Sequence, residues 1–181
     1  NAGEEDASPA TYTIPVSSPA TVTVSGRVWD DADGSVTLNG GEAGTNALST
    51  TLTVYGVDSA GNVVATAPVA ADGTYTLVGV PANSAVTLRL SNDDSVAIGS
   101  SSPAAGLPVG WTNTGENRNG VSETTTPGEL AITTATTPVA NQDFGIRRTE
   151  DSDGDGIPNS SDVDDDQDGI LDIDEGTDDF D

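Results

Sequence analysis

The end of the chain carries two consecutive twelve-residue segments in which oxygen-bearing side chains recur at fixed positions. Positions 1, 3, 5, 9 and 12 of each segment are Asp, Asn or Glu, and position 6 is Gly156 or Gly169. Calcium takes about six to eight oxygen ligands, and a curled loop turns alternate residues toward one ion, with glycine making the sharp turn before the carbonyl at position 7. The spacing therefore predicts two calcium loops, with ligands Asp151, Asp153, Asp155, Ile157, Asn159, Asp162, and Asp164, Asp166, Asp168, Ile170, Asp172, Glu175.

An acidic tail that is merely solvated is the alternative interpretation. Two complete tandem matches, each with its glycine and a following apolar residue, favour calcium over a chance match. Magnesium fits less well, because it prefers octahedral geometry and keeps several waters. We therefore expect metal binding to supply most of the folding free energy of this tail.

A third, degenerate loop begins at Asp31. Its oxygen-bearing residues again fall at positions 1, 3, 5, 9 and 12, but Val36 replaces the glycine at position 6 and Ser35 is a weaker ligand at position 5. The spacing allows a third calcium ion or a plain acidic loop, and the residues alone do not choose between them. The candidate ligands are Asp31, Asp33, Ser35, Thr37, Asn39 and Glu42.

The charge of the chain excludes several functions. The 181 residues include 30 acids and five basic residues, all arginine, which gives a formal net charge of −25. Such a chain has too few basic side chains to release the counter-ions of nucleic acid, which disfavours nucleic-acid binding. Without histidine or cysteine it has no Ser-His-Asp triad, thiol chemistry or Cys/His zinc site. No apolar run reaches the roughly 18 residues that a membrane span needs.

Short runs rich in Thr and Val, punctuated by Gly and Pro, predict an all-β fold. We expect a leader at residues 1–24, a β-sandwich at 25–148 and the calcium-loop tail at 149–181. A further strand is expected in the leader at Ala20–Val24, and the long stretch Gly99–Glu129 is expected to be a loop. Strands of the sandwich are predicted at Gly26–Trp29, Ser49–Val57, Asn62–Ala67, Thr74–Val80, Ala85–Leu90, Ser95–Ile98, Leu130–Thr134 and Val139–Ile146.

The leader contains a second alternating run, Thr11–Val16, which is typical of a strand. Two interpretations are open. The run either pairs with the sheet edge of a neighbouring copy, as donor strands do, or packs on its own sandwich. The candidate self-association residues are Thr11, Tyr12, Thr13, Ile14 and Val16.

Several short motifs in order resemble the Sdr-type B domain, a relative of Cna B-type modules of bacterial surface proteins. The resemblance covers about residues 25–146, and the tail resembles thrombospondin type 3 calcium repeats. It implies a Greek-key, prealbumin-like sandwich that acts as an extracellular spacer, with calcium bound by the Asp31 loop. The Lys–Asn/Asp isopeptide bond of Cna B-type relatives cannot form in a chain without lysine. The motifs are Val24–Gly34, Thr53–Tyr55, Asn62–Thr66, Asp72–Thr76, Gly79–Ala82, Leu107–Trp111 and Asn141–Ile146.

These observations favour a non-enzymatic, calcium-rigidified structural module of an extracellular or cell-surface bacterial stalk, fibre or matrix. Its expected partners are copies of itself or neighbouring repeats. The alternative is an adhesin or carbohydrate-binding module that uses the Gly99–Glu129 stretch, although Trp111 in it is expected to be mostly buried. An enzyme is disfavoured, because no group of carboxylates stands apart from the calcium pattern. The candidate sugar contacts are Trp111, Asn113, Asn117, Arg118 and Asn119.

Overall fold

The computed structural model describes residues 18–39, 41–123 and 126–149, together with Val163. Within these ranges the chain forms nine strands and no helix, so the predicted all-β class is confirmed. Consistent with this, the described residues include no helix that is long and apolar enough to cross a membrane. The strands are β1 (Thr21–Asp30), β2 (Thr53–Val57), β3 (Val63–Pro68), β4 (Thr74–Pro81), β5 (Ala85–Ser91), β6 (Trp111–Arg118), β7 (Val121–Glu123), β8 (Glu129–Thr133) and β9 (Gln142–Arg148).

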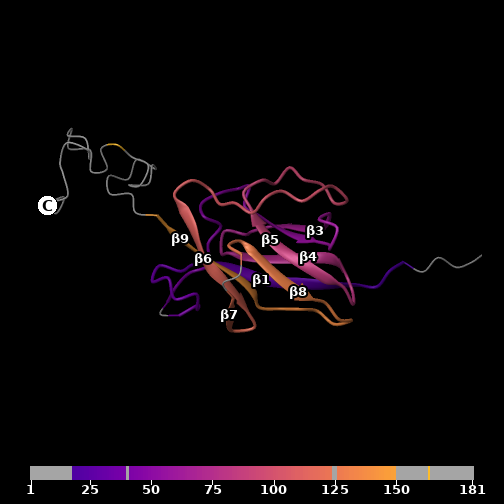
Figure 1. Ribbon diagram of the computed structural model, residues 1–181. Helices are drawn as coiled ribbons and strands as arrows, with labels where there is room; N and C mark the ends of the chain where they lie inside the picture. Colours follow the sequence, from indigo (N-terminus) through magenta and orange to yellow (C-terminus); the bar gives the residue numbers. More distant parts are fainter. Residues whose placement is uncertain (1–17, 40, 124–125, 150–162, 164–181) are drawn as a thin grey trace, which may run out of the picture.

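The strands form two sheets that face each other as a sandwich (Figure 1). The five-stranded sheet has the order β4-β1-β9-β6-β7, and the four-stranded sheet has the order β3-β2-β5-β8. All neighbours are antiparallel except β1 and β9, which run parallel with Val28 opposite Phe144. The predicted two-sheet β-sandwich is therefore confirmed.

One continuous apolar core lies between the sheets. Alternation along the strands places every second side chain in this core, as in β5, where Val86, Leu88 and Leu90 are buried. Four aromatic side chains, Trp29, Tyr55, Tyr75 and Phe144, are at most 3% exposed. Tyr75 and Phe144 lie in this core, whereas Tyr55 belongs to a second, smaller cluster with Val57 and Val63. Trp111 is only half-buried, and it packs against the core while Arg148 lies over its ring.

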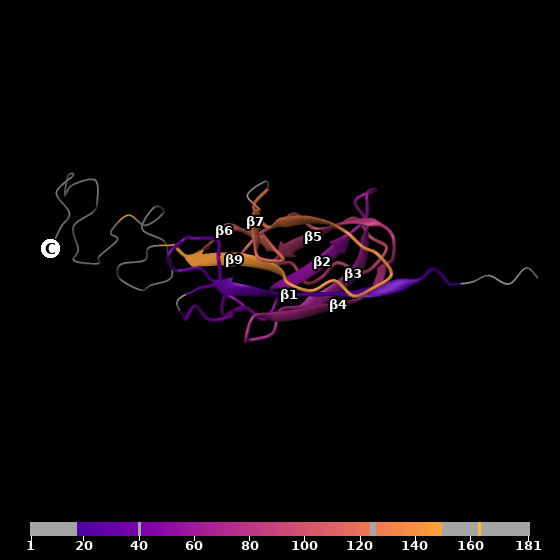
Figure 2. The ribbon, with the colours of Figure 1, turned by 90° about the horizontal axis from the view of Figure 1, so that it is seen from below.

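The parallel pairing of β1 and β9 sets the direction of the chain through the sandwich. β1 begins at one end of the sandwich, and β9 finishes at the opposite end (Figure 2). The described chain therefore enters and leaves at opposite ends. β1 also runs without interruption across the expected division after residue 24, so the predicted strands at Ala20–Val24 and Gly26–Trp29 form a single element.

The strand predicted at Ser95–Ile98 is wrong. The Asp93 carboxylate instead accepts hydrogen bonds from the backbone N–H of Ser95 at 2.9 Å and from its hydroxyl at 2.6 Å. This Asx turn offers the backbone a local alternative to strand pairing. The segment crosses the outer face of the four-stranded sheet, where Val96 packs against Tyr55 and the Tyr55 hydroxyl donates to the Asp93 carbonyl at 2.6 Å.

The prediction of one long loop at Gly99–Glu129 is also wrong. Strands β6 and β7 lie inside this stretch, and β8 begins at its last residue. The sequence of β6 shows little alternation of apolar and polar residues, so it does not predict a strand. It is held instead by pairing with β9 on one side and β7 on the other.

Candidate functional site

The loop that follows β1 is a candidate metal site. Its first residue, Asp31, comes directly after the strand, and its backbone N–H donates to the Ile146 carbonyl of β9 at 2.7 Å. The far end of the loop returns to β1, because the Asp30 N–H donates to the Ala43 carbonyl at 2.9 Å. Both ends of the loop are therefore fixed to the five-stranded sheet.

Three carboxylates from positions 1, 3 and 12 of this loop converge. One oxygen from each of Asp31, Asp33 and Glu42 lies within 4.8 Å of the others. Among the described residues, these are the only three carboxylates grouped closely enough to hold a metal ion. Three of the six candidate ligands of this loop therefore lie together as a group that could hold a metal ion.

Asp31 is fully buried, which is unusual for a carboxylate unless the charge is balanced. Its Oδ1 accepts the Ser35 N–H and its Oδ2 accepts the Val36 N–H, both at 3.0 Å. Gly145 of β9 makes room for it, since a Cβ there would lie 3.3 Å from Asp31 Oδ2 and 2.9 Å from Trp29 Cζ2. The carboxylate and the indole therefore pack against the same glycine.

The Asn39 amide lies among the polar atoms of the loop. Its Nδ2 donates to Asp33 Oδ2 at 3.2 Å and to Ser35 Oγ at 2.9 Å. The pKa of Asp33 is lowered, chiefly by hydrogen bonds from the Ser35 and Asn39 side chains. Rotation of the Asn39 amide by half a turn would present Oδ1 in place of the N–H donors, as a cation ligand requires.

Glu42 supplies an oxygen without a partner. Its Oε2 accepts the Asn39 N–H at 3.0 Å, whereas Oε1 is shielded from solvent and has no hydrogen-bond partner among the described residues. A buried carboxylate oxygen left unpaired is costly. A cation placed between the three carboxylates would satisfy it.

Val36 makes the turn that glycine is predicted to make at position 6 of the tail loops. Its φ is 57°, in the left-handed region that a β-branched residue rarely adopts. Two contacts hold it there, since its carbonyl accepts hydrogen bonds from Ser122 Oγ at 3.1 Å and Asn117 Nδ2 at 3.4 Å. The departure from glycine therefore leaves the turn intact. Thr37, at position 7, is exposed, and its carbonyl accepts the Ser35 hydroxyl at 3.1 Å.

Two groups of predicted site residues lie outside the described residues. This applies to both tail loops, from Asp151 to Glu175, and to the self-association strand Thr11–Val16. The candidate calcium ligands and the donor strand in those segments therefore stay predictions.

The candidate sugar contacts are not brought together by the fold. Trp111 and Asn113 line one hollow of about 240 Å³ beside Leu90 and Gly128. Asn117 and Asn119 line a different hollow of about 340 Å³. Arg118 pairs with the Glu123 carboxylate across the β6–β7 hairpin. The predicted surface is therefore divided between two places.

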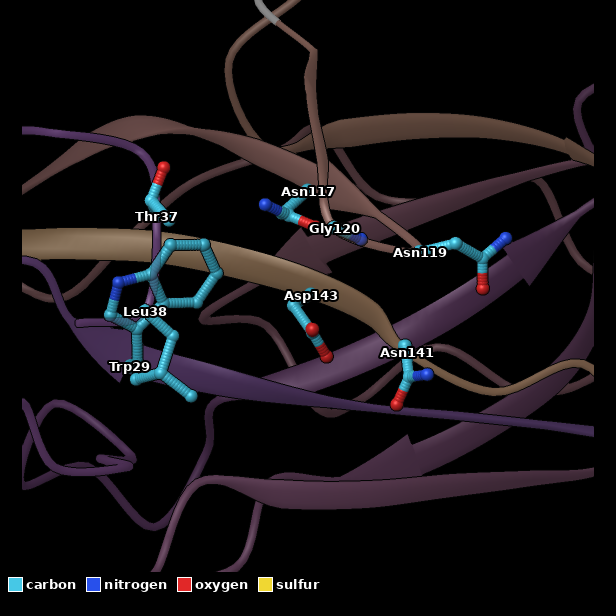
Figure 3. A pocket seen from close by; sticks show the side chains of 8 residues that line it. All are labelled: Trp29, Thr37, Leu38, Asn117, Asn119, Gly120, Asn141 and Asp143. Carbon is cyan, nitrogen blue, oxygen red and sulfur yellow. Dashed lines mark hydrogen bonds between the residues drawn. The ribbon is translucent and has the colours of Figure 1, made fainter.

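The second hollow lies on the five-stranded sheet, close to the acidic loop. Figure 3 shows Asp143 in its middle, Thr37, Leu38 and Trp29 toward one end, and Asn119 and Asn141 toward the other. Thr37 and Leu38 come from the acidic loop, so the loop forms one wall of the hollow. No sequence pattern indicates that Asn141 and Asp143 line this hollow, because the hollow forms where the start of β9 meets the β6–β7 turn.

A carboxyl group buried between the sheets is a further feature that the sequence analysis missed. Glu116 of β6 is fully buried, its Oε1 accepts the Gly128 N–H at 2.7 Å, and its Oε2 has no partner among the described residues. Burial raises the pKa of Glu116 to about 7, against the lowering effect of the Gly128 hydrogen bond. This group lies away from the acidic loop, and it bears on stability.

The fold and the loop together define a two-sheet β-sandwich that carries a cluster of candidate metal ligands at one end. A comparison with protein-family models found no match for the chain. A comparison with curated proteins found no match either.

Proposed function

We propose that the protein is a non-enzymatic, calcium-rigidified structural module of an extracellular bacterial surface stalk, fibre or matrix. The observation that carries the proposal is the convergence of Asp31, Asp33 and Glu42, with oxygens within 4.8 Å of one another. Hard carboxylate oxygens at positions 1, 3 and 12 of a loop are a donor set for calcium. Outside cells, where calcium is abundant, a site with a Kd of about 10⁻⁴–10⁻³ M is sufficient.

The loop can hold the ion with few rearrangements. Asp31, Asp33 and Glu42 would give carboxylate oxygens, Thr37 its carbonyl, and Ser35 its hydroxyl. Asn39 would contribute Oδ1 once its amide has rotated. The buried and unpaired Glu42 Oε1 supports this arrangement, because a bound cation removes the cost of leaving it unsatisfied.

Calcium at this place would stiffen one end of the sandwich. The loop is bonded to β9 through Asp31 and to the β6–β7 hairpin through the Val36 carbonyl. An ion bound by both Asp31 and Glu42 would therefore fix the loop to β6, β7 and β9. Since the described chain enters and leaves at opposite ends, a stiffened sandwich suits an in-line spacer (Figure 2).

The resemblance to the Sdr-type B domain supports the same role and implies Greek-key, prealbumin-like connections between the two sheets. The predicted tail loops, which resemble thrombospondin type 3 repeats, would add two further calcium ions after the sandwich. We propose that the module associates with copies of itself or with neighbouring repeats. Filaments of the native material that dissolve on addition of chelator, seen by electron microscopy, would support this assembly.

Thermal unfolding with calcium and with chelator tests the role of the loop. We expect calcium to raise the Tm of the wild-type chain, because a ligand that binds only the folded state stabilises it by mass action. Asp31→Asn should lower this calcium-dependent shift. Asp94→Asn, an exposed carboxylate outside the loop, is the matched control and should keep the full shift.

A Tm shift of the same size in Asp31→Asn and in wild type would show that calcium acts elsewhere, for instance in the tail. The double variant Asp33→Asn/Glu42→Gln guards against local misfolding of the Asp31 variant, because both of its residues are less buried than Asp31. Calcium-independent unfolding of the wild-type chain would contradict the proposal outright.

A further inference from the structure

A polar groove runs over the five-stranded sheet beside the acidic loop. It consists of two adjoining hollows of about 340 Å³ and 430 Å³, which share Leu38, Asn141 and Asp143 as lining residues. Each hollow falls in the size range of small-molecule sites, roughly 300–1,000 Å³. Because they share lining residues, the two hollows adjoin and offer room for more than one sugar unit.

Three polar groups in the groove have no partner among the described residues. The side-chain amides of Asn119 and Asn141 make no hydrogen bond there, and neither does Asp143 Oδ2. Asp143 Oδ1, by contrast, accepts the Arg27 N–H at 2.8 Å, which fixes the carboxylate between β1 and β9. Figure 3 places Asp143 between the Asn117 side and the Asn141 side of the hollow. The groove therefore presents hydrogen-bond donors and acceptors along its length.

Hydrogen bonds fix the backbone of the two turns that carry the exposed Asn119 and Asn141 side chains. Asn119 and Asn141 both have a φ of 54°, in the left-handed region, and the Asn119 N–H donates to the Asn141 carbonyl at 2.9 Å. Asn117 Oδ1 accepts the Gly120 N–H at 2.7 Å and so fixes the turn that carries Asn119. The backbone of these turns is therefore fixed in the free protein, while the exposed amides stay accessible to a ligand.

The charge of the chain and the polar groups of the groove favour a neutral ligand that is rich in hydroxyl groups. The chain as a whole carries a formal net charge of −25, which repels polyanions. Burial raises the pKa of the Asp143 carboxyl, against the lowering effect of the hydrogen bond from the Arg27 backbone. Amides and carboxylates match pairs of sugar hydroxyls, while Leu38, which is 44% exposed, offers an apolar contact for a sugar ring face.

We propose that this groove binds a neutral oligosaccharide, with Asn119, Asn141 and Asp143 as its hydrogen-bonding residues. This inference goes beyond the structural role, since a spacer needs no ligand. It also relocates the sugar-binding surface expected from the sequence. Trp111, Asn113 and Arg118 are not part of it, whereas Asn117 shapes the turn and Asn119 contributes an amide.

Titration of the ¹⁵N-labelled full chain with neutral hexasaccharides tests the proposal by NMR, with calcium present throughout. The probes are the linear hexamers of cellulose, xylan, mannan, chitin, laminarin and starch. For at least one probe we expect saturable shifts of the Asn119 and Asn141 side-chain amide signals. The variant Asn119→Gly/Asn141→Gly should weaken binding by about ten-fold, because two hydrogen bonds are lost while glycine keeps the left-handed backbone.

Asn83→Gly is the matched control. Asn83 also has a left-handed φ of 51°, but it lies in the turn between β4 and β5 and lines neither hollow. The Asn83→Gly variant should bind the hexasaccharide with the same affinity as the wild-type chain. Three results would overturn the proposal: no saturable shift with any hexasaccharide, equal affinity in the groove variant and wild type, or shifts that appear only on raising the protein concentration, which would show that the groove holds a second copy.

Discussion

Val36 of the acidic loop lies against Gly115 of β6 so closely that no side chain fits between them. A Cβ on Gly115 would lie 2.6 Å from Val36 Cγ1, a distance that real Cβ atoms do not show. Val36 meanwhile holds a φ of 57°. The loop therefore keeps a strained residue at its turn because β6 provides a space of matching shape.

This relationship predicts energetic coupling between the two positions. Gly115→Ala should lower the free energy of unfolding by about 1–3 kcal/mol, because its Cβ meets Val36 and its φ of 149° suits glycine. Val36→Gly should recover part of that loss in the double variant, with a coupling free energy of about 1 kcal/mol. Urea unfolding of the four members of the cycle measures it.

Gly120→Ala supplies the control for backbone strain alone. Gly120 has a φ of 84°, and a Cβ there would meet nothing within 4 Å. Its cost should therefore come from the backbone and should not change when Val36→Gly is added. Strict additivity of Gly115→Ala and Val36→Gly would show that the contact carries no free energy.

Glu116 predicts a dependence of stability on pH. Its pKa is about 7 in the folded protein, raised first by burial, against 4.5 for an ordinary glutamate. The folded chain therefore holds a proton that the unfolded chain has lost, so stability falls as the pH rises from about 4.5 to about 7. The loss is on the order of 2–3 kcal/mol, since each pKa unit corresponds to about 1.4 kcal/mol.

Glu116→Gln should remove this dependence. The amide stays neutral at every pH and still accepts the Gly128 N–H. The variant is therefore expected to match wild type at about pH 4 and to be more stable than wild type at about pH 8. Asp94→Asn, an exposed carboxylate that is not among the groups acting on the pKa of Glu116, is the control and should leave the pH profile in place. A profile unchanged in Glu116→Gln would contradict the assignment.

The predicted tail loops give a third test. With calcium bound, the segment from Asp151 to Glu175 should resist the serine protease Glu-C, and chelator should restore cleavage. Asp166→Asn, at position 3 of the second loop, should abolish protection of that loop. Asp165→Asn is the matched control, because position 2 is not a ligand position in this spacing. Cleavage that is equally fast with and without calcium would show that the tail forms no calcium loops.

The sequence predicted those strands whose apolar residues alternate and the loop whose ligands follow a fixed spacing. β3, β4 and β5 fall within two residues of their expected ranges, since each has one buried face. The spacing of Asp31, Asp33 and Glu42 likewise predicted their convergence. Both patterns lie within short segments of the sequence, so they can be recognised without knowledge of the tertiary structure.

What the sequence did not predict depends on contacts between distant segments. β6 is rich in polar residues, and its strand conformation comes from its position between β9 and β7. Val96 and Ile98 alternate like a strand, but the Asp93 turn prevents pairing. Asn119 and Asn141 share the groove only because one backbone hydrogen bond joins two separate turns. No pattern within either segment indicates such a meeting.

The most direct measurement of the central claim is tryptophan-sensitised terbium luminescence of the full chain. Terbium replaces calcium at oxygen sites, and Trp29 packs beside Asp31 against Gly145, whereas the predicted tail loops contain no tryptophan or tyrosine. Excitation of tryptophan should give saturable terbium emission that calcium displaces and that Asp31→Asn abolishes. Absence of sensitised emission, or emission unchanged in Asp31→Asn, would show that the loop after β1 binds no calcium.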